Sequence, residues 1–114
     1  MIAYHVLVPT AQIEPLDALG EPMRRAILER LAERPWPVGE LARELPVSRP
    51  AVSQHLKVLK DARLVIDRSA GNRRIYEVDP AGLRELREYL EQFWGRALSA
   101  YKTAVEQTNS KESE

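Results

Sequence analysis

Residues 48–64 read SRPAVSQHLKVLKDARL, and this stretch decides the fold. Its apolar residues recur at the i, i+4, i+7 spacing that gives a helix one buried face. That face consists of Val52, Leu56 and Leu59, followed by Ala62 and Leu64. The spacing predicts a helix that is followed by a strand beginning at Leu64.

The remaining face of this helix carries long donors and small hydroxyls, namely Arg49, Ser53, Gln54, Lys57 and Lys60. Arg, Ser and Gln at the exposed N-terminal end of a helix suit the major groove of DNA, where Arg can bond guanine and Gln adenine. Taken alone, the segment fits an ordinary amphipathic surface helix with solvated charges equally well. The neighbouring elements favour DNA binding, because they follow in the order that a DNA-binding module requires.

A short helix is predicted at Val38–Leu45, joined to the first by a tight connection at Pro46-Val47. Two strand-like runs follow, Leu64–Ile66 and Arg73–Val78, on either side of Ser69-Ala70-Gly71-Asn72. Gly71 and Asn72 tolerate positive φ, so we predict a β-hairpin. The predicted fold is therefore mainly α with a small β-hairpin, a winged helix-turn-helix.

Arginines cluster at the tip of this hairpin, at Arg68, Arg73 and Arg74. A wing that carries them could meet DNA phosphates or the minor groove, and a merely solvated hairpin tip is the alternative. Ser48 is predicted to be the N-cap of the main helix, and Pro50 lies in its first turn, where a missing N–H costs nothing.

The formal net charge of the chain is zero, but the charge is unevenly distributed. The balance is −2 over residues 1–46, +5 over residues 47–74 and −3 over residues 75–114. The basic residues of the middle region are Arg49, Lys57, Lys60, Arg63, Arg68, Arg73 and Arg74. A local positive field on the segment that should face DNA matters more for phosphate binding than the overall pI.

The chain has 114 residues, which indicates one small domain. Domains of this size are often stabilised by a partner subunit. The chain contains no cysteine, which excludes disulfides and thiolate metal sites and fits a cytoplasmic protein. The longest apolar run, IAYHVLV, is too short to cross a membrane. It is interpreted as an arm, a short strand or a sequence foreign to the domain.

The predicted organisation has three parts: an N-terminal arm at residues 1–10, a winged helix-turn-helix domain with dimerisation helices at residues 11–105, and a disordered tail at residues 106–114. The domain should begin with a short helix at residues 11–19. A second helix should open at Glu21-Pro22 and stop before Pro35 and Pro37. One face of that second helix carries Met23, Ile27 and Leu31.

The last helix is predicted from Pro80 to Val105, with apolar residues every three or four positions. Exposed, this face would exceed what soluble monomers tolerate, so pairing with a second copy is the simplest solution. We predict that dimerisation uses Leu86, Leu90, Phe93, Trp94, Ala97 and Tyr101. An alternative is that Phe93, Trp94 and Tyr101 line a pocket for a small apolar effector.

The stretch from about Leu19 to Leu98 resembles the ArsR/SmtB-type winged-helix repressors of bacteria. The resemblance is carried by GELARELPVSRPAVSQHLKVLKDARLV, by DRSAGNRRIYEVDP and by FWGRAL in the last helix. The phrase SRPAVSQHLKVL is most similar to the metal-independent actinobacterial branch. The resemblance implies a homodimer, joined by the first and last helices, that reads a palindromic operator. It also implies base or phosphate contacts by Val38, Arg49, Pro50, Ser53 and Gln54.

The chain departs from the sensing chemistry of this family. The positions that match the cysteine pair of arsenic-sensing members are Pro37 and Gly39, and those that match the zinc ligands are Pro80, Gly82, Phe93 and Arg96. None of these residues is a metal ligand, so we expect no metal and no other cofactor. The only histidines, His5 and His55, are expected to be packed or phosphate-contacting residues. Arg63 stands where many relatives have glycine, and should adopt a strained left-handed conformation.

Enzymatic function finds no support in the sequence. Ser53 and His55 are two positions apart on a helix, so their side chains diverge and cannot act as nucleophile and base. The rival from another class is a winged-helix module that binds protein instead of DNA. The positive balance of residues 47–74 argues against it, because a protein-binding module has no need of arginines on both helix and wing.

Overall fold

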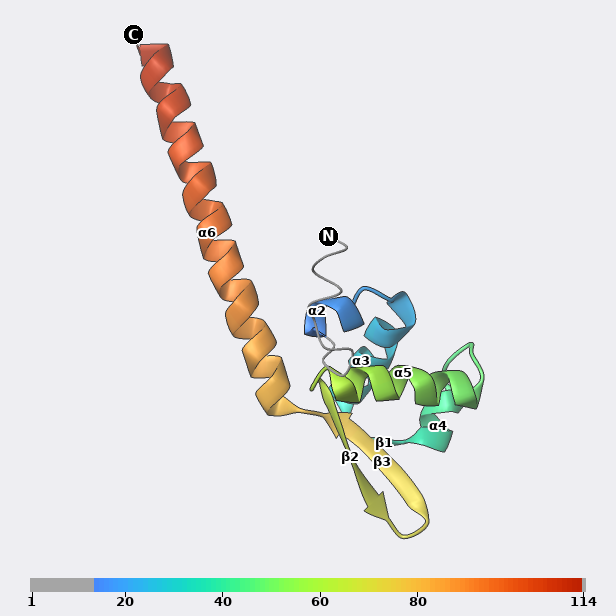
Figure 1. The fold of residues 1–114 in the computed structure, drawn as a ribbon. Coiled ribbons are helices and arrows are strands. Elements are labelled where there is room, and N and C mark those ends of the chain that lie inside the picture. Colours follow the sequence, from blue (N-terminus) through green and yellow to red (C-terminus); the bar gives the residue numbers. More distant parts are fainter. Residues whose placement is uncertain (1–13, 114) are drawn as a thin grey trace, which may run out of the picture. The chain divides into compact units, whose positions relative to one another are not determined.

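The computed structural model describes residues 14–113, with side chains described to Asn109. The predicted N-terminal arm and the first three residues of the predicted helix at 11–19 lie outside this range. The described part forms two units that meet between Leu83 and Arg84, and each is considered by itself. The first unit contains α2 (Pro15–Ala18), α3 (Pro22–Glu33), α4 (Val38–Arg43), α5 (Arg49–Asp61) and a small sheet (Figure 1).

Helix α5 agrees closely with the helix predicted from residues 48–64. Ser48 is its N-cap, and the Ser48 hydroxyl accepts a hydrogen bond from the backbone N–H of Ala51 at 3.3 Å. Pro50 lies in its first turn, as predicted. Val52, Leu56 and Leu59 are all 0% exposed, so the predicted buried face is confirmed.

The core of the first unit gathers the apolar faces of all its helices. Its buried members are Ala18, Ile27, Leu31, Trp36, Leu41, Val52, Leu56, Leu59, Ala62, Leu64 and Val65. Of the face predicted for α3, Ile27 and Leu31 are buried and Met23 is half-buried. These side chains come from every helix of the unit and from the start of the sheet, so the unit has one shared core.

Helix α4 ends at Arg43, two residues before the predicted end. The backbone N–H groups of Glu44 and Leu45 donate to carbonyls three residues back, at 3.0 and 3.4 Å, which is the pattern of a tightened final turn. Leu45 precedes Pro46, and a residue before proline is disfavoured in the helical region. The proline therefore accounts for the shorter helix.

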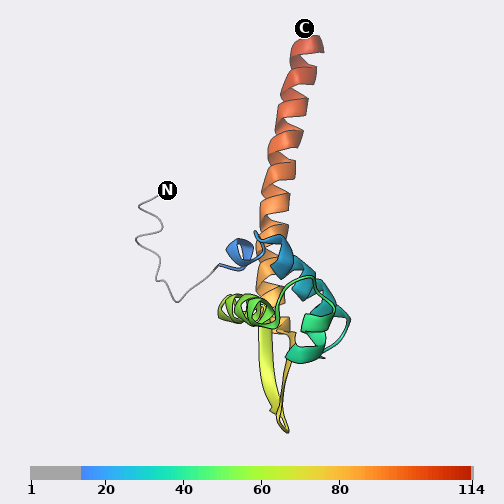
Figure 2. The same cartoon turned by 90° about the vertical axis from the view of Figure 1, so that its right-hand side faces the viewer.

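The sheet has three antiparallel strands, β1 (Trp36–Pro37), β2 (Val65–Ala70) and β3 (Arg73–Val78), in the order β1-β3-β2. Strands β2 (Val65–Ala70) and β3 (Arg73–Val78) form the predicted hairpin, which extends away from α5 in the turned view (Figure 2). The predicted first strand was too short and began one residue early. Ala70 pairs with Arg73, so the turn contains only Gly71 and Asn72, and Gly71 has a positive φ of 64°.

Strand β1 (Trp36–Pro37) was not predicted, so the fold has a three-stranded sheet where a hairpin alone was expected. Its residues pair with Tyr76 and Ile75 of β3. A two-residue strand that contains proline gives almost no periodic signal, and proline is tolerated there because β1 is an edge strand. Trp36 is 6% exposed, and its indole N–H donates to the carbonyl of Arg30 at 3.1 Å.

Helix α6 (Pro80–Ser113) begins where predicted but continues eight residues past Val105. The predicted disordered tail is therefore wrong for residues 106–113, which are helical. No glycine or proline interrupts this segment, and Glu, Gln and Lys are good helix formers. The hydroxyl of Thr108 is satisfied within the helix, because it donates to the carbonyl of Ala104 at 3.0 Å.

The junction between α5 and the sheet has the predicted left-handed residue, since Arg63 has φ 65°. Its carbonyl lies against Gly82 in the first turn of α6, and a β-carbon on Gly82 would lie 1.6 Å from that oxygen. Asp79 caps the same turn, where its Oδ1 accepts from the backbone N–H of Ala81 at 3.0 Å. Glycine is required at position 82 because the backbone of Arg63 occupies the space of a side chain.

Replacing Gly82 by Ala is expected to lower the free energy of unfolding by about 1–3 kcal/mol, because the new β-carbon would meet backbone that cannot move aside cheaply. Urea denaturation at one fixed protein concentration measures the change. Gly95→Ala is the matched control, since a β-carbon at that position of α6 meets nothing within 4 Å. A Gly82→Ala protein as stable as the wild type would contradict this close approach.

Candidate DNA-binding interface

The polar face of α5 is presented to solvent because the opposite face is buried. The α5 residues that the sequence predicted for DNA contact are all exposed, namely Arg49, Pro50, Ser53, Gln54, Lys57 and Lys60. The acidic Asp61, at the C-terminal end of α5, is exposed as well. The helix thus offers donors along its outer side, with the predicted base-reading residues Ser53 and Gln54 in its N-terminal half.

Arg49, the first residue of α5, lies against the helix that precedes it. A β-carbon on Gly39 of α4 would lie 3.5 Å from Nη1 of Arg49. The guanidinium of Arg49 therefore lies close to the start of α4. Val38 is half-buried at that same start of α4. The fold thus brings Val38 and Arg49, eleven positions apart in the sequence, to one end of the exposed surface.

The three predicted arginines of the β2–β3 hairpin, hereafter the wing, are all exposed. Arg68 lies on β2, while Arg73 and Arg74 are the first two residues of β3. Arg73 donates through Nη2 to Oε1 of Glu40 on α4 at 2.6 Å. Both side chains of this pair are about half exposed, so the pair lies at the surface where a DNA phosphate would compete for the arginine.

Asp67 on β2 connects the wing with the C-terminal end of α5. Its Oδ1 lies 2.8 Å from Nζ of Lys60, and its Oδ2 lies 3.4 Å from Nε of Arg74. The hydrogen bond and the charge of Asp67 raise the pKa of Lys60, and they outweigh the opposing effects of burial and of Arg74. Lys60 therefore stays positively charged beside the wing.

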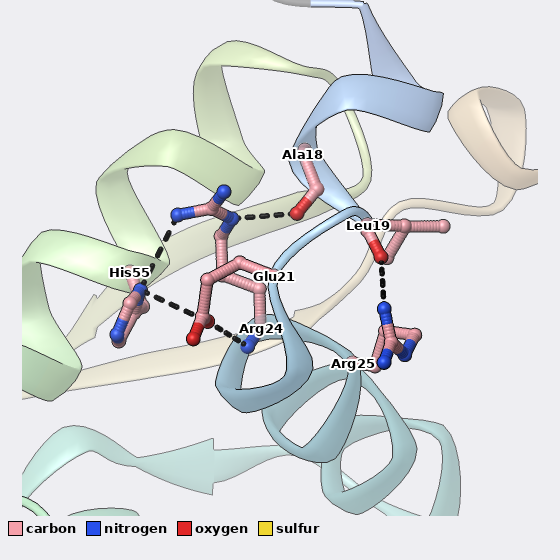
Figure 3. Close-up of polar contacts among 6 residues, drawn as sticks. All are labelled: Ala18, Leu19, Glu21, Arg24, Arg25 and His55. Carbon is pink, nitrogen blue, oxygen red and sulfur yellow. Dashed lines mark hydrogen bonds and ion pairs between the residues drawn. The ribbon is translucent and has the colours of Figure 1, made fainter.

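His55 lies inside the helical part of the unit and not on the exposed face (Figure 3). Its side chain is 22% exposed, and Nδ1 lies 3.8 Å from Oε2 of Glu21 and 3.5 Å from Nη1 of Arg24. Arg24 also donates through Nε to the carbonyl of Ala18 at 2.5 Å. Of the two roles expected for His55, the structure gives it the packed one, in a polar cluster that joins α2, α3 and α5.

Glu21 serves this cluster as the N-cap of α3, since its carboxylate accepts from the backbone N–H of Arg24 at 2.9 Å. Burial acts to raise the pKa of Glu21, but backbone hydrogen bonds from Arg24 and Met23, together with electrostatic interactions with His55 and Arg24, lower it overall. Arg25 donates to the carbonyl of Leu19 at 2.7 Å. The cluster thus satisfies backbone groups at the end of α2 and the start of α3.

Sequence reasoning missed the acidic partners of the interface, Glu40 and Asp67. Asp67 entered the sequence analysis only through the charge balance of residues 47–74. Pairing in the register Asp67↔Tyr76 places Asp67 on the side of the sheet that meets Lys60. The sequence shows only that an acidic residue, Asp67, stands in the first strand of the wing. Its partners, Lys60 and Arg74, are determined by how α5 and β3 pack around it.

The residues predicted for dimerisation lie on α6. Leu90, Phe93, Trp94, Ala97 and Tyr101 are exposed and Leu86 is half-buried. Trp94 is 62% and Tyr101 68% exposed. Large apolar side chains exposed along one helix are unusual in a protein that remains a monomer.

The positions that correspond to metal ligands in related sensors carry no donor side chain. Pro37 and Gly39 lie at β1 and α4, and Pro80, Gly82, Phe93 and Arg96 lie along α6. Within the described part of the chain, no group of three or more His, Asp or Glu side chains is placed to hold a metal ion. No helix among residues 14–113 is both long and apolar enough to cross a membrane.

Comparison with known proteins supports the same interpretation of the interface. A family model described as a helix-turn-helix domain matches residues 19–68. The HTH-type transcriptional regulator Rv2034 of Mycobacterium tuberculosis is 64% identical over 90 residues, which cover 79% of this chain and 84% of that protein. The chain belongs to the ArsR/SmtB family of winged helix-turn-helix transcriptional regulators.

Two further regulators are similar to this chain, one in sequence and one in sequence and fold. The transcriptional repressor SdpR of Bacillus subtilis is 29% identical over 76 residues, which cover 67% of this chain and 84% of SdpR. The structure of an ArsR-like transcriptional regulator from Rhodococcus sp. RHA1 matches with a TM-score of 0.65 and 33% identity, covering 77% of this chain and 86% of the other. The predicted winged helix-turn-helix fold is confirmed. The protein is a DNA-binding transcriptional regulator. The relatives named above are also described as regulators and not as enzymes.

Replacing Glu40 by Gln is expected to tighten binding to duplex DNA of any sequence by up to about fivefold. The exposed pair with Arg73 is worth at most about 1 kcal/mol, and the carboxylate would no longer compete with phosphates for the arginine. Fluorescence anisotropy with a labelled duplex measures the affinity. Glu44→Gln, which removes the same charge from an exposed residue without an ion pair in the described structure, is the control. Weaker binding by Glu40→Gln than by this control would contradict the competition.

Proposed function

We propose that this regulator is a repressor that binds a palindromic operator as a homodimer and does not respond to metals. The observation that carries the proposal is the exposed face of α5 beside the wing. Residues 47–74, which contain α5 and most of the wing, have a charge balance of +5 in a chain of zero net charge. The positive field would draw this face to the DNA backbone. The name of the Bacillus subtilis relative, a transcriptional repressor, supports repression.

Base reading is assigned to the N-terminal half of α5. Arg49, Ser53 and Gln54 are exposed there, where the side chains of a recognition helix reach base edges in the major groove. Val38 and Pro50 are assigned to the adjacent backbone and base edges. Arg and Gln are the residue types that bond guanine and adenine bidentately, so specificity should depend mainly on Arg49 and Gln54.

Backbone contact is assigned to the cations of the wing and of the C-terminal half of α5. They are Lys57, Lys60, Arg68, Arg73 and Arg74, all exposed. Phosphate contacts fix register and orientation without carrying sequence information. The two groups of residues should therefore respond differently to substitution.

The homodimer is supported by the apolar face of α6. Its exposed residues include Tyr89, Leu90, Phe93, Trp94, Leu98 and Tyr101. A second copy of the same face would cover them in a two-fold arrangement, in which each surface patch meets itself. Two recognition helices about 34 Å apart would then enter successive major grooves and read an inverted repeat.

Substitution of Arg49 or Gln54 by Ala is expected to cost about 1–3 kcal/mol on the operator and to relax preference at one base position per half-site. Substitution of Arg73 or Arg74 should weaken all sequences similarly and reduce the salt slope by about 1 for each phosphate that is no longer neutralised. Genomic selection of bound fragments supplies the operator, and anisotropy on operator and scrambled duplex across a salt series gives both quantities. The assignment is reversed if the wing variants lose specificity while the helix variants lose only salt dependence.

Light scattering is expected to show a dimer at micromolar concentration, because the α6 face is too apolar to remain in water. Trp94→Glu should shift the population to monomer by placing a charge in the covered face. The control is Arg87→Glu, on the same helix but with a polar side chain that is 80% exposed. A wild-type protein that is monomeric under these conditions would remove the basis for the dimer.

Metals are expected to leave operator affinity unchanged, because the matching positions offer no donor atoms. Titration of zinc, nickel or arsenite into the complex of protein and operator tests this. A tenfold loss of affinity with any of them, equivalent to about 1.4 kcal/mol of coupling, would show that the protein senses that metal.

A further inference from the structure

The acidic side chain of Asp67 contacts both α5 and the other strand of the wing. Asp67 belongs to β2 and its side chain is 10% exposed. One carboxylate oxygen is 2.8 Å from Nζ of Lys60 on α5, and the other is 3.4 Å from Nε of Arg74 on β3. The same carboxylate therefore contacts one cation from each of the two elements that should meet DNA.

The exposures of the three groups show which of them DNA can reach. Lys60 and Arg74 are each 52% exposed, whereas Asp67 is covered. A phosphate can thus approach both cations from outside without displacing the carboxylate. Arg74 faces Asp67 through Nε, so the N–H groups of its two terminal nitrogens remain for another acceptor.

We propose that Asp67 is a positioning residue for DNA binding, which holds Lys60 and Arg74 in a fixed relation so that both reach the DNA backbone together. The proposal rests on the proposed function of this face. Long cationic side chains lose rotamer freedom when they bind, and a partner that orders them beforehand reduces that cost. Asp67 also links the end of α5 to the wing, and so fixes the spacing between the two DNA-contacting elements.

Positioning and simple electrostatics make opposite predictions for this residue. Removing an acid from a surface that faces DNA should strengthen binding, because it removes repulsion of the phosphates. Loss of positioning should weaken binding, because Lys60 and Arg74 would no longer be ordered. The sign of the change in affinity for Asp67→Asn therefore separates the two accounts.

Glu77 provides a matched control on the same hairpin. It lies on β3 opposite Ile66 and makes no ion pair within the described structure. Glu77→Gln changes the charge of the wing by the same amount as Asp67→Asn without disturbing a contact of Lys60 or Arg74.

The experiment measures the affinity of the full chain for a short, labelled, mixed-sequence duplex across a salt series. Asp67→Asn is expected to bind about three- to tenfold more weakly than Glu77→Gln, which corresponds to the ordering cost of one long side chain. Its salt slope should be smaller by about 1 for each phosphate that Lys60 or Arg74 no longer neutralises. Circular dichroism melting of each variant shows that the fold is retained.

Two further variants confirm that Asp67 acts through its cations. In a Lys60→Ala/Arg74→Ala background Asp67 has nothing to position, so adding Asp67→Asn should strengthen binding, as Glu77→Gln does. Arg74→Lys keeps the charge at an exposed position but lacks the planar guanidinium, whose Nε faces Asp67 while its terminal nitrogens remain for a phosphate. Arg74→Lys should bind DNA more weakly than the wild type. This variant tests the positioning role of Asp67 if Asp67→Asn does not fold.

The outcomes separate this proposal from the function on which it rests. If the wild-type protein fails to bind the duplex at low salt, the proposed function is wrong and the positioning role falls with it. If the wild type binds but Asp67→Asn binds as tightly as Glu77→Gln, or if Arg74→Lys equals the wild type in affinity and salt slope, DNA binding stands and the positioning role of Asp67 is overturned.

Discussion

Burial of one stripe of α5 is the constraint on which the rest of the interface depends. Val52, Leu56 and Leu59 are fully buried, and each such side chain contributes about 1.5–3 kcal/mol when it leaves water. Rotating the helix about its axis would expose all three together. The stripe therefore fixes which side chains face outward, and the outward set is the one suited to DNA. The orientation of α5 about its own axis is therefore determined by apolar packing and not by its charges.

The basic residues of the outward face are not only concentrated there but also paired with acidic side chains. Glu40 meets Arg73 in an exposed pair, whereas Asp67 lies covered beneath Lys60 and Arg74. An exposed acid competes with phosphate for its arginine, while a covered acid leaves the outer donors of its partners available. Zero net charge is thus compatible with a basic surface, because most of the acidic residues lie in the regions on either side of it in the sequence.

The sequence predicted those features that depend on local chemistry. The N-cap role of Ser48 and the positive φ of Arg63 could both be predicted, because each depends on a few neighbouring residues and on backbone sterics. Strand β1 was not readable, since Trp36–Pro37 is a strand only through its pairing with β3. The partners of Lys60 and Arg73 depend likewise on how helices pack on the sheet. The helical residues 106–113 were misjudged because polarity was taken for disorder.

We propose that the outer face of α5 and the wing together form the DNA-binding surface. Amide chemical shifts of the full chain, recorded during titration with a duplex that carries the selected operator, test this proposal. We expect the largest changes in the N-terminal half of α5 and around the wing turn at Gly71 and Asn72. Changes confined to α6, with α5 and the wing unaffected, would contradict it.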